Sequence, residues 1–156
     1  MSFERARAYL QSRGLADRIM TFEQSSATVE LAAHAAGVEP ARIAKTLSFY
    51  LGDRVALVLF AGDARVDNRK FKETFHTKAK MLRADDAETL IGHGVGGVCP
   101  FGVNDGCDVY LDESLRRFDV VYPAAGDAAS AVRLTVEELE QACEPCSWVN
   151  VSKLPA

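Results

Sequence analysis

The most informative absence in the sequence is a long hydrophobic run: no apolar stretch approaches the roughly 20 residues that a bilayer-spanning helix needs. The beginning of the chain, MSFERARAYL, is charged and helical in pattern, which is unlike a secretory signal. Internal repeats, low-complexity segments and Pro/Ser-rich linkers are also missing. For a chain of 156 residues, these absences predict one domain spanning residues 1–156, located in the cytoplasm and without a membrane partner.

Histidines and cysteines are few, and their spacing does not suit a metal site. The three histidines never stand three to five residues apart, and Cys99 and Cys107 do not repeat the C-x-x-C spacing of Cys143 and Cys146. A thioredoxin-like pair would open a helix after a strand, whereas this pair follows a predicted helix. We therefore expect reduced thiols near a helix end, no bound metal and no cofactor.

Familiar catalytic and nucleotide-binding motifs are absent as well. Neither a G-x-S-x-G nucleophile elbow nor the G-K-[S/T] of a P-loop occurs. A formal G-x-G-x-x-G at Gly92, Gly94 and Gly97 leaves a predicted helix and runs into Pro100, whereas a dinucleotide site must open a helix. A regular alternation of strands and helices is missing too, which argues against a Rossmann fold.

Charge is present but unevenly distributed. The chain has a net charge of −4, yet residues 65–83 contain seven Lys or Arg against two acids. This stretch therefore has a net charge of +5, against −9 for the remainder of the chain. A basic face on an acidic body suits docking to an anionic partner, and an ordinary solvated helix face explains it equally well.

Hydrophobic patterning predicts short helices packed around a sheet. Helices are predicted over residues 3–13, 29–36 (capped by Thr28 and ended by Gly37), 68–75 (capped by Asp67), 85–92 (capped by Asp85) and 136–143 (a Thr135–Glu138 capping box). Strands are predicted over 43–51, 55–61, 79–83, 107–112, 119–123, 130–134 and 147–152, and the Gly52–Asp53 pair predicts a hairpin turn between the first two. The set indicates an α+β fold with a mixed, largely antiparallel sheet.

One residue stands out in the first strand, RIAKTLSFYL. Alternation along a strand places Lys45 on the same face as Ile43, Leu47 and Phe49, and Thr46 on the other face. A lysine among apolar neighbours keeps its charge only where an anion is near or the site opens to water. Lys45 is therefore either a functional cation or a side chain whose ammonium reaches solvent over an apolar stem.

The second unusual stretch is the loop GHGVGGVCPFG, with five glycines in eleven residues. Glycines let the backbone approach a ligand closely, and consecutive amides in such a turn can surround an oxygen. A tight connection without a ligand explains the composition equally well. Cys99 lies in this loop, but no motif places a histidine to activate it, and His93 is only near in sequence.

Taken in order, RIAKTLSF, RKFKETF, KAKMLRADDAETLIGHGVGGVCPFG and VYLDESL resemble the YbaK family, which is related to the editing domain inserted in bacterial prolyl-tRNA synthetases. The resemblance covers residues 22–153 and rests on several motifs at consistent spacing. It implies the α+β editing-domain fold with a partly barrel-like sheet. It also implies a free-standing enzyme that hydrolyses the ester between a wrong amino acid and the 3′ end of a tRNA, commonly the tRNA for proline.

The resemblance also implies the site residues. The family lysine falls on Lys45, which would stabilise the tetrahedral intermediate and position the terminal nucleotide. The family G-x-x-x-P motif falls on Gly96, Gly97, Val98, Cys99 and Pro100, which would hold the aminoacyl group together with Thr28 and Thr46. The family needs no metal, and the attacking group would be water.

Partners and substrate follow as expectations. Arg69, Lys70 and Lys72 are expected to contact tRNA phosphates, prolyl-tRNA synthetase is a candidate partner, and the protein is expected to be a monomer or a weak homodimer. Thr46 stands where alanine-specific editors have Asn, and Tyr122 where they have His, so the amino acid is left open among Cys, Ala and other small residues.

Two other functional classes compete with the hydrolase. The same fold could bind an aminoacyl or nucleotide ligand, or tRNA itself, without hydrolysis. A thiol protein that uses Cys143 and Cys146 is the other alternative.

Overall fold

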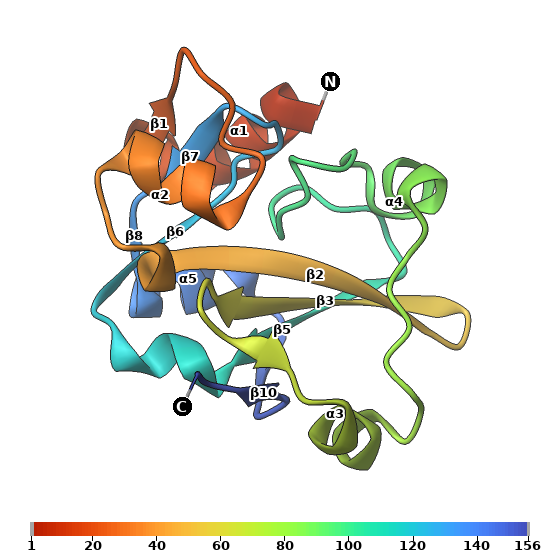
Figure 1. Cartoon of the computed structure of the whole chain (residues 1–156). Coiled ribbons are helices and arrows are strands. Elements are labelled where there is room, and N and C mark those ends of the chain that lie inside the picture. The colour runs from red at the N-terminus through yellow and green to blue at the C-terminus, as the bar shows by residue number, and fades with distance from the viewer. Residues whose placement is uncertain (1, 156) are drawn as a thin grey trace.

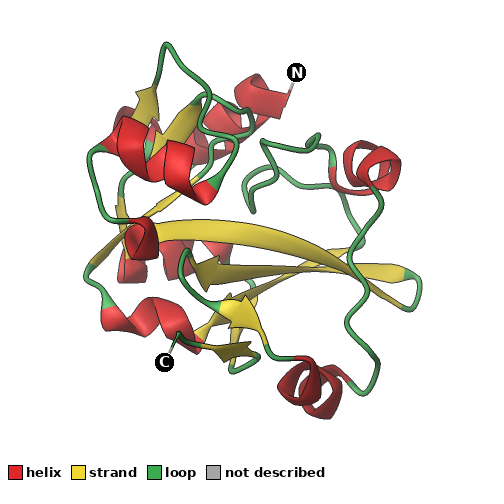
Figure 2. Ribbon diagram, in the orientation of Figure 1, coloured by secondary structure: helices red, strands yellow, loops and turns green. Residues whose placement is uncertain are grey.

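Five short α-helices surround a curled mixed sheet in the computed structural model, which describes residues 2–155 (Figures 1 and 2). The α-helices are α1 Ser2–Ser12, α2 Val29–Ala36, α3 Asn68–Phe75, α4 Ala84–Ile91 and α5 Val136–Cys143. The strands are β1 Ile19–Thr21, β2 Ile43–Leu51, β3 Arg54–Ala61, β4 Arg65–Val66, β5 Cys107–Asp112, β6 Val120–Pro123, β7 Ser130–Val132, β8 Leu134–Thr135, β9 Cys146–Val149 and β10 Ser152–Lys153. Three 3₁₀ turns complete the set: η1 Ala16–Arg18, η2 Pro40–Arg42 and η3 Glu113–Arg117.

The central sheet has six strands in the order β8-β6-β2-β3-β5-β9. Strands β2 and β3 form the predicted antiparallel hairpin, in which Lys45 lies opposite Phe60. Strand β6 pairs in parallel with β2, β5 pairs in parallel with β3, and β9 pairs in parallel with β5. Three of the five strand pairs in this sheet are therefore parallel. The pairs β8–β6, β1–β7 and β10–β4 are antiparallel. The predicted α+β class with a mixed sheet is confirmed, with a larger parallel share in its centre than the sequence indicated.

Strand β3 forms the middle of the hydrophobic core. All residues of its run VALVLFA are buried, with at most 5% of the surface exposed, because other elements cover both faces. An aromatic cluster extends the core toward α3, with ring centroids 4.8 Å apart for Phe49 and Phe71 and 4.6 Å apart for Phe71 and Phe75. This packing fixes the hairpin on which Lys45 and Thr46 lie.

Local sequence signals explain most helix boundaries. The Thr28 hydroxyl accepts a hydrogen bond from the Leu31 amide at 3.1 Å, and Gly37 ends α2 with φ of 72°, a value that favours glycine. Thr135 and Glu138 form the predicted capping box at the start of α5.

Two predictions about the segment before the glycine loop are wrong. Residues 79–83 are not a strand, because Met81 makes only an isolated bridge to Phe49. Helix α4 is capped by the backbone of Arg83, not by Asp85, which lies within the first helical turn. There the Asp85 carboxylate complements the helix dipole, so the acidic pattern was real but displaced by two residues.

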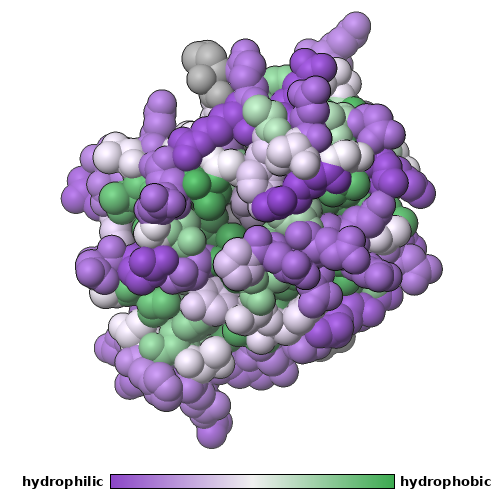
Figure 3. Space-filling view, turned by 180° about the vertical axis from the view of Figure 1, so that it is seen from behind, coloured by the Kyte–Doolittle hydropathy of each residue, from purple (hydrophilic) through white to green (hydrophobic). Residues whose placement is uncertain are grey.

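On the face seen from behind, hydrophilic side chains dominate, with smaller hydrophobic patches between them (Figure 3). Within residues 2–155, no helix combines the length and apolarity that a membrane span requires.

Candidate functional site

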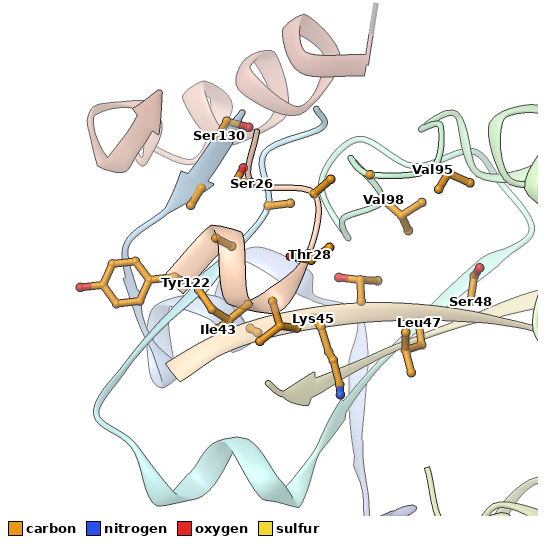
Figure 4. A pocket seen from close by; sticks show the side chains of 18 of the residues that line it. Ser26, Thr28, Ile43, Lys45, Leu47, Ser48, Val95, Val98, Tyr122 and Ser130 are labelled. Atoms are coloured by element: carbon orange, nitrogen blue, oxygen red, sulfur yellow. The ribbon is translucent and has the colours of Figure 1, made fainter. Parts of the chain in front are cut away.

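A cavity of about 320 Å³ opens above β2, between α2 and the glycine loop (Figure 4). Its walls come from segments far apart in the sequence: the start of α2 with the residues before it, the β2 strand, residues 81–82, the glycine loop, and the β6 and β7 region. Five of the site residues predicted from the sequence line this cavity: Thr28, Lys45, Thr46, Gly96 and Val98. The strand and the glycine loop, 50 residues apart in the chain, therefore meet at one site.

Alternation along β2 decides which side chains face the cavity. Lys45 and Leu47 leave the strand on one side and Ser48 leaves it on the other (Figure 4). Thr46 shares the face of Ser48, because neighbouring side chains on a strand point in opposite directions. Thr46 therefore lies on the face of β2 that borders the cavity, while its hydroxyl oxygen is itself buried.

The Lys45 ammonium lies at the edge of the site and does not face the glycine loop. Its Nζ donates hydrogen bonds to the carbonyl oxygens of Ala64, at 2.5 Å, and Gly62, at 3.3 Å, on the side of β2 away from Val98 (Figure 4). Partial burial lowers the pKa of Lys45 below its usual value, and the nearby carboxylates of Asp63 and Glu30 oppose that shift. Strand alternation and two carbonyl acceptors thus hold the Lys45 ammonium on the side of β2 away from the glycine loop.

Only part of the glycine loop reaches the cavity. Gly96 and Val98 line it, whereas the predicted contacts Gly97, Cys99 and Pro100 lie behind them and are buried. A Cβ on Gly97 would stand 2.5 Å from the backbone of Gly126, so this glycine is needed for close packing of two loops. Gly97, Cys99 and Pro100 therefore shape the loop from behind.

Cys99 cannot serve as a thiolate nucleophile in this environment. Its side chain is fully buried, and burial raises the pKa of the Cys99 thiol to about 12. The Sγ atom lies 3.5 Å from His93 Nε2, but that nitrogen is also 2.7 Å from the carbonyl oxygen of Phe101. Burial lowers the pKa of His93, so the pair is a neutral core contact.

Sequence reasoning missed two further cavity residues, Ser26 and Ser130. The hydroxyls of Ser26, Thr46 and Ser130 are buried and have no hydrogen-bond partner within residues 2–155, and all three residues line the cavity. A buried hydroxyl without a partner costs on the order of 1–3 kcal/mol. Single serines in loops and short strands carry no sequence signal of such a role, because only the fold brings them together.

The cavity contains no acidic side chain. Lys45 is the one charged residue among its lining residues, and the remaining side chains are apolar or bear a hydroxyl. The described part of the chain also contains no group of three or more His, Cys, Asp and Glu side chains placed to hold a metal ion.

The basic helix α3 lies apart from the cavity, on the opposite side of β2 and β3 (Figure 1). Arg69 is 89% exposed and pairs with Glu73 at 3.3 Å, and Lys72 is exposed. Lys70 is engaged in the fold, because its Nζ donates to the Ser152 carbonyl oxygen at 2.8 Å. The three predicted tRNA contacts therefore lie apart from the cavity.

The C-x-x-C pair has the character of structural thiols. Cys143 and Cys146 are free, and burial raises the pKa of the Cys143 thiol well above its usual value. Cys146 Sγ lies 3.6 Å from the carbonyl oxygen of Glu140 at the end of α5. Neither residue lines the cavity.

Comparison with known proteins assigns the chain to a family. A family model described as an aminoacyl-tRNA editing domain matches residues 23–142. The chain belongs to this editing-domain family. The uncharacterized protein YwhH of Bacillus subtilis is 45% identical to this editing domain over 154 residues, which cover 98% of each chain. The proline–tRNA ligase of Caldicellulosiruptor bescii is 30% identical over 90 residues, which are 57% of this chain but 15% of the ligase.

Solved structures agree with the family. The fold of this editing domain matches a protein described as a proposed trans-editing enzyme for prolyl-tRNA synthetase with a TM-score of 0.87, at 28% identity over 97% of both chains. It matches the hypothetical protein APE2540 with a TM-score of 0.86, at 27% identity over 96% of this chain and 99% of the other. The resemblance to this editing family, stated from the motifs, is confirmed.

Proposed function

We propose that this protein hydrolyses the ester bond of a mischarged aminoacyl-tRNA. The substrate we propose is the tRNA for proline carrying Cys, Ala or another small amino acid. The observation that supports this proposal is the cavity of about 320 Å³, in which the strand motif around Thr46 and the glycine loop at Gly96 form facing walls. The chain's membership in the editing-domain family supplies the reaction class. Work on tRNA implies a cytoplasmic location.

The geometry suggests how the substrate lies. The cavity holds the aminoacyl group against Gly96 and Val98, while the terminal nucleotide stays at the edge where the Lys45 ammonium is held. The Lys45 ammonium is partly shielded from water and donates only to neutral carbonyl oxygens, so it can still bind an anionic ligand. Lys45 therefore positions the terminal phosphate or the ester carbonyl and stabilises the negative charge that develops in the transition state.

Water is the attacking group in this mechanism. The water oxygen bonds to the carbonyl carbon, the carbon–oxygen bond to the ribose breaks, and the departing ribose oxygen takes up a proton. The buried Cys99 thiol contributes no nucleophile, because its pKa of about 12 leaves it protonated at neutral pH. A neighbouring hydroxyl of the substrate ribose is placed to help deliver the proton.

The decisive experiment is a deacylation panel with purified protein and the tRNA for proline charged with Ala, Cys, Ser or Pro. Lys45→Ala should lose about 10²–10³-fold in rate, the value typical of a lost oxyanion donor, whereas Cys99→Ala should keep most of the activity. The reverse result, an inactive Cys99→Ala and an active Lys45→Ala, would identify a thiol enzyme instead.

One observation favours a second function. Because the Lys45 ammonium is bound to two carbonyl oxygens and does not face the glycine loop, the same cavity could hold an aminoacyl ligand without hydrolysing it. Tight binding of mischarged tRNA with no release of amino acid in the panel would establish this binding function.

A further inference from the structure

The two ends of the glycine loop are bridged by one residue of the N-terminal helix. Arg5 lies on α1, which precedes the residues 23–142 matched by the family model. Its guanidinium lies against Gly92 at one end of the loop, and its backbone lies against Gly102 at the other end. A Cβ on Gly92 would stand 2.8 Å from Arg5 Cζ, and a Cβ on Gly102 would stand 2.9 Å from the Arg5 carbonyl oxygen. Only glycine at both ends therefore lets Arg5 approach this closely.

Asn104 links this bridge to the backbone on both sides of the loop. Arg5 Nη2 donates a hydrogen bond to Asn104 Oδ1 at 2.6 Å. The Asn104 backbone amide donates to the Ile91 carbonyl oxygen at 2.8 Å, and its side-chain nitrogen donates to the Thr89 carbonyl oxygen at 3.1 Å. Because a guanidinium can only donate, Arg5 fixes the Asn104 oxygen toward itself and the amide nitrogen toward the end of α4.

The position of the loop matters because its middle forms one wall of the cavity. Gly96 and Val98 line the cavity, and glycine-rich backbone has unusual conformational freedom, so the way in which the ends are held decides where the middle lies. Resting on the proposed deacylase function, we propose that Arg5 is a positioning residue. By joining the two ends of the glycine loop, it places Gly96 and Val98 against the aminoacyl group.

Steady-state deacylation of the mischarged tRNA for proline tests this role. Arg5→Gln should lower kcat about tenfold, because a small misplacement of the aminoacyl group slows the reaction strongly. KM should change by less than about twofold, because the bridge orients the ester and does not bind the tRNA phosphates. Arg7→Gln is the matched control: Arg7 is an exposed cation on the same helix, so this variant loses the same charge and should keep the wild-type kcat.

A double-mutant cycle separates positioning from a general loss of stability. Asn104→Ala should lower kcat as Arg5→Gln does, and the double variant should be no slower than the slower single variant, because both substitutions break one bridge. Arg5→Lys, which keeps a donor for Asn104, should recover part of kcat. The urea midpoints of all these variants should stay close to that of the wild type, because the Arg5–Asn104 hydrogen bond is exposed. An unchanged kcat in Arg5→Gln, or independent effects of the two substitutions, would overturn the inference.

Amide hydrogen exchange tests the bridge without using the deacylase reaction. The peptide covering residues 92–102 should exchange at least about threefold faster in Arg5→Gln than in the wild type and in Arg7→Gln. Faster exchange in a protein that hydrolyses no charged tRNA would support the bridge and refute the proposed function. Unchanged exchange in an active deacylase would refute the bridge and leave the proposed function intact.

Discussion

At the scale of single residues, the cavity retains polar groups that the fold itself does not use. Ser130 is nearly fully buried on β7, yet its hydroxyl has no partner among residues 2–155. Residues kept for function often lower stability, because the site must be preorganised before its ligand arrives. The cost of the three buried hydroxyls is measurable.

The first residue-scale prediction concerns stability. Ser130→Ala should leave the free energy of unfolding unchanged or raise it by up to about 1 kcal/mol, because it removes a buried hydroxyl that has no partner. Urea denaturation of both proteins measures the change. Ser114→Ala is the contrasting control: the Ser114 hydroxyl accepts from the Ala61 amide at 3.0 Å, so its loss should destabilise the fold. A clear loss of stability in Ser130→Ala would mean that the hydroxyl is hydrogen-bonded in solution.

The second residue-scale prediction follows from the neutral, buried His93. Because its pKa is lowered in the folded state, the unfolded chain binds more protons in the interval below about 6.5, the usual histidine value. Stability is therefore fully present above that value and falls as the pH decreases through the interval, with a slope of at most about 1.4 kcal/mol per pH unit.

Denaturation curves between pH 7 and 5 measure this slope, a range above the usual carboxyl pKa values. His93→Gln, which cannot be charged there, should flatten the slope. His34→Gln should retain it, because His34 is exposed on α2. An unchanged slope in His93→Gln would mean that another group is responsible.

At the scale of elements, the end of β5 ties the C-terminal strands to the core. Asp112 is fully buried, and its carboxylate accepts hydrogen bonds from the Val151 amide at 2.8 Å, the Ser114 amide at 2.9 Å and the Ser152 hydroxyl at 2.6 Å. This residue ends the sequence motif CDVYLD. Asp112 therefore has a structural role in the motif VYLDESL, since it does not line the cavity.

We predict that Asp112→Ala lowers the free energy of unfolding by about 3 kcal/mol or more, because it leaves two buried amides without an acceptor. The matched control is Asp108→Ala on the same strand. Asp108 forms an exposed pair with Arg54 at 2.8 Å, so its loss should cost less than about 1 kcal/mol. Guanidinium denaturation compares them, and equal effects would refute the role assigned to Asp112.

Sequence patterns predicted elements better than their three-dimensional arrangement. The hairpin of β2 and β3 and the caps Thr28 and Thr135 were correct, because alternation and capping are local effects. The predictions of a strand at 79–83 and of a helix cap at Asp85 were wrong. In this segment, contacts with distant parts of the chain decide the structure, and local sequence does not reveal them. Periodicity placed Lys45 on the right strand, but it could not tell which of two covered faces borders the cavity.

At the scale of the whole molecule, the basic helix α3 is separated from the cavity. It lies on the opposite side of the β2–β3 hairpin from the site (Figure 1). Cations placed there cannot touch the reacting ester. They can raise the rate of encounter and the affinity for an anionic polymer, which are effects of long range and strong salt dependence.

The last prediction uses this separation. Replacing Arg69 and Lys72 by glutamine should lower kcat/KM for the charged tRNA and reduce the slope of its logarithm against log salt by about 2, or roughly 0.9 for each lost phosphate contact. The rate at saturating tRNA should stay unchanged, because neither residue reaches the cavity. The matched control removes two exposed cations outside the basic stretch, Arg7 and Arg133. If both double variants change the slope equally, α3 adds only net charge, and the phosphate contacts must lie on another face of the editing domain.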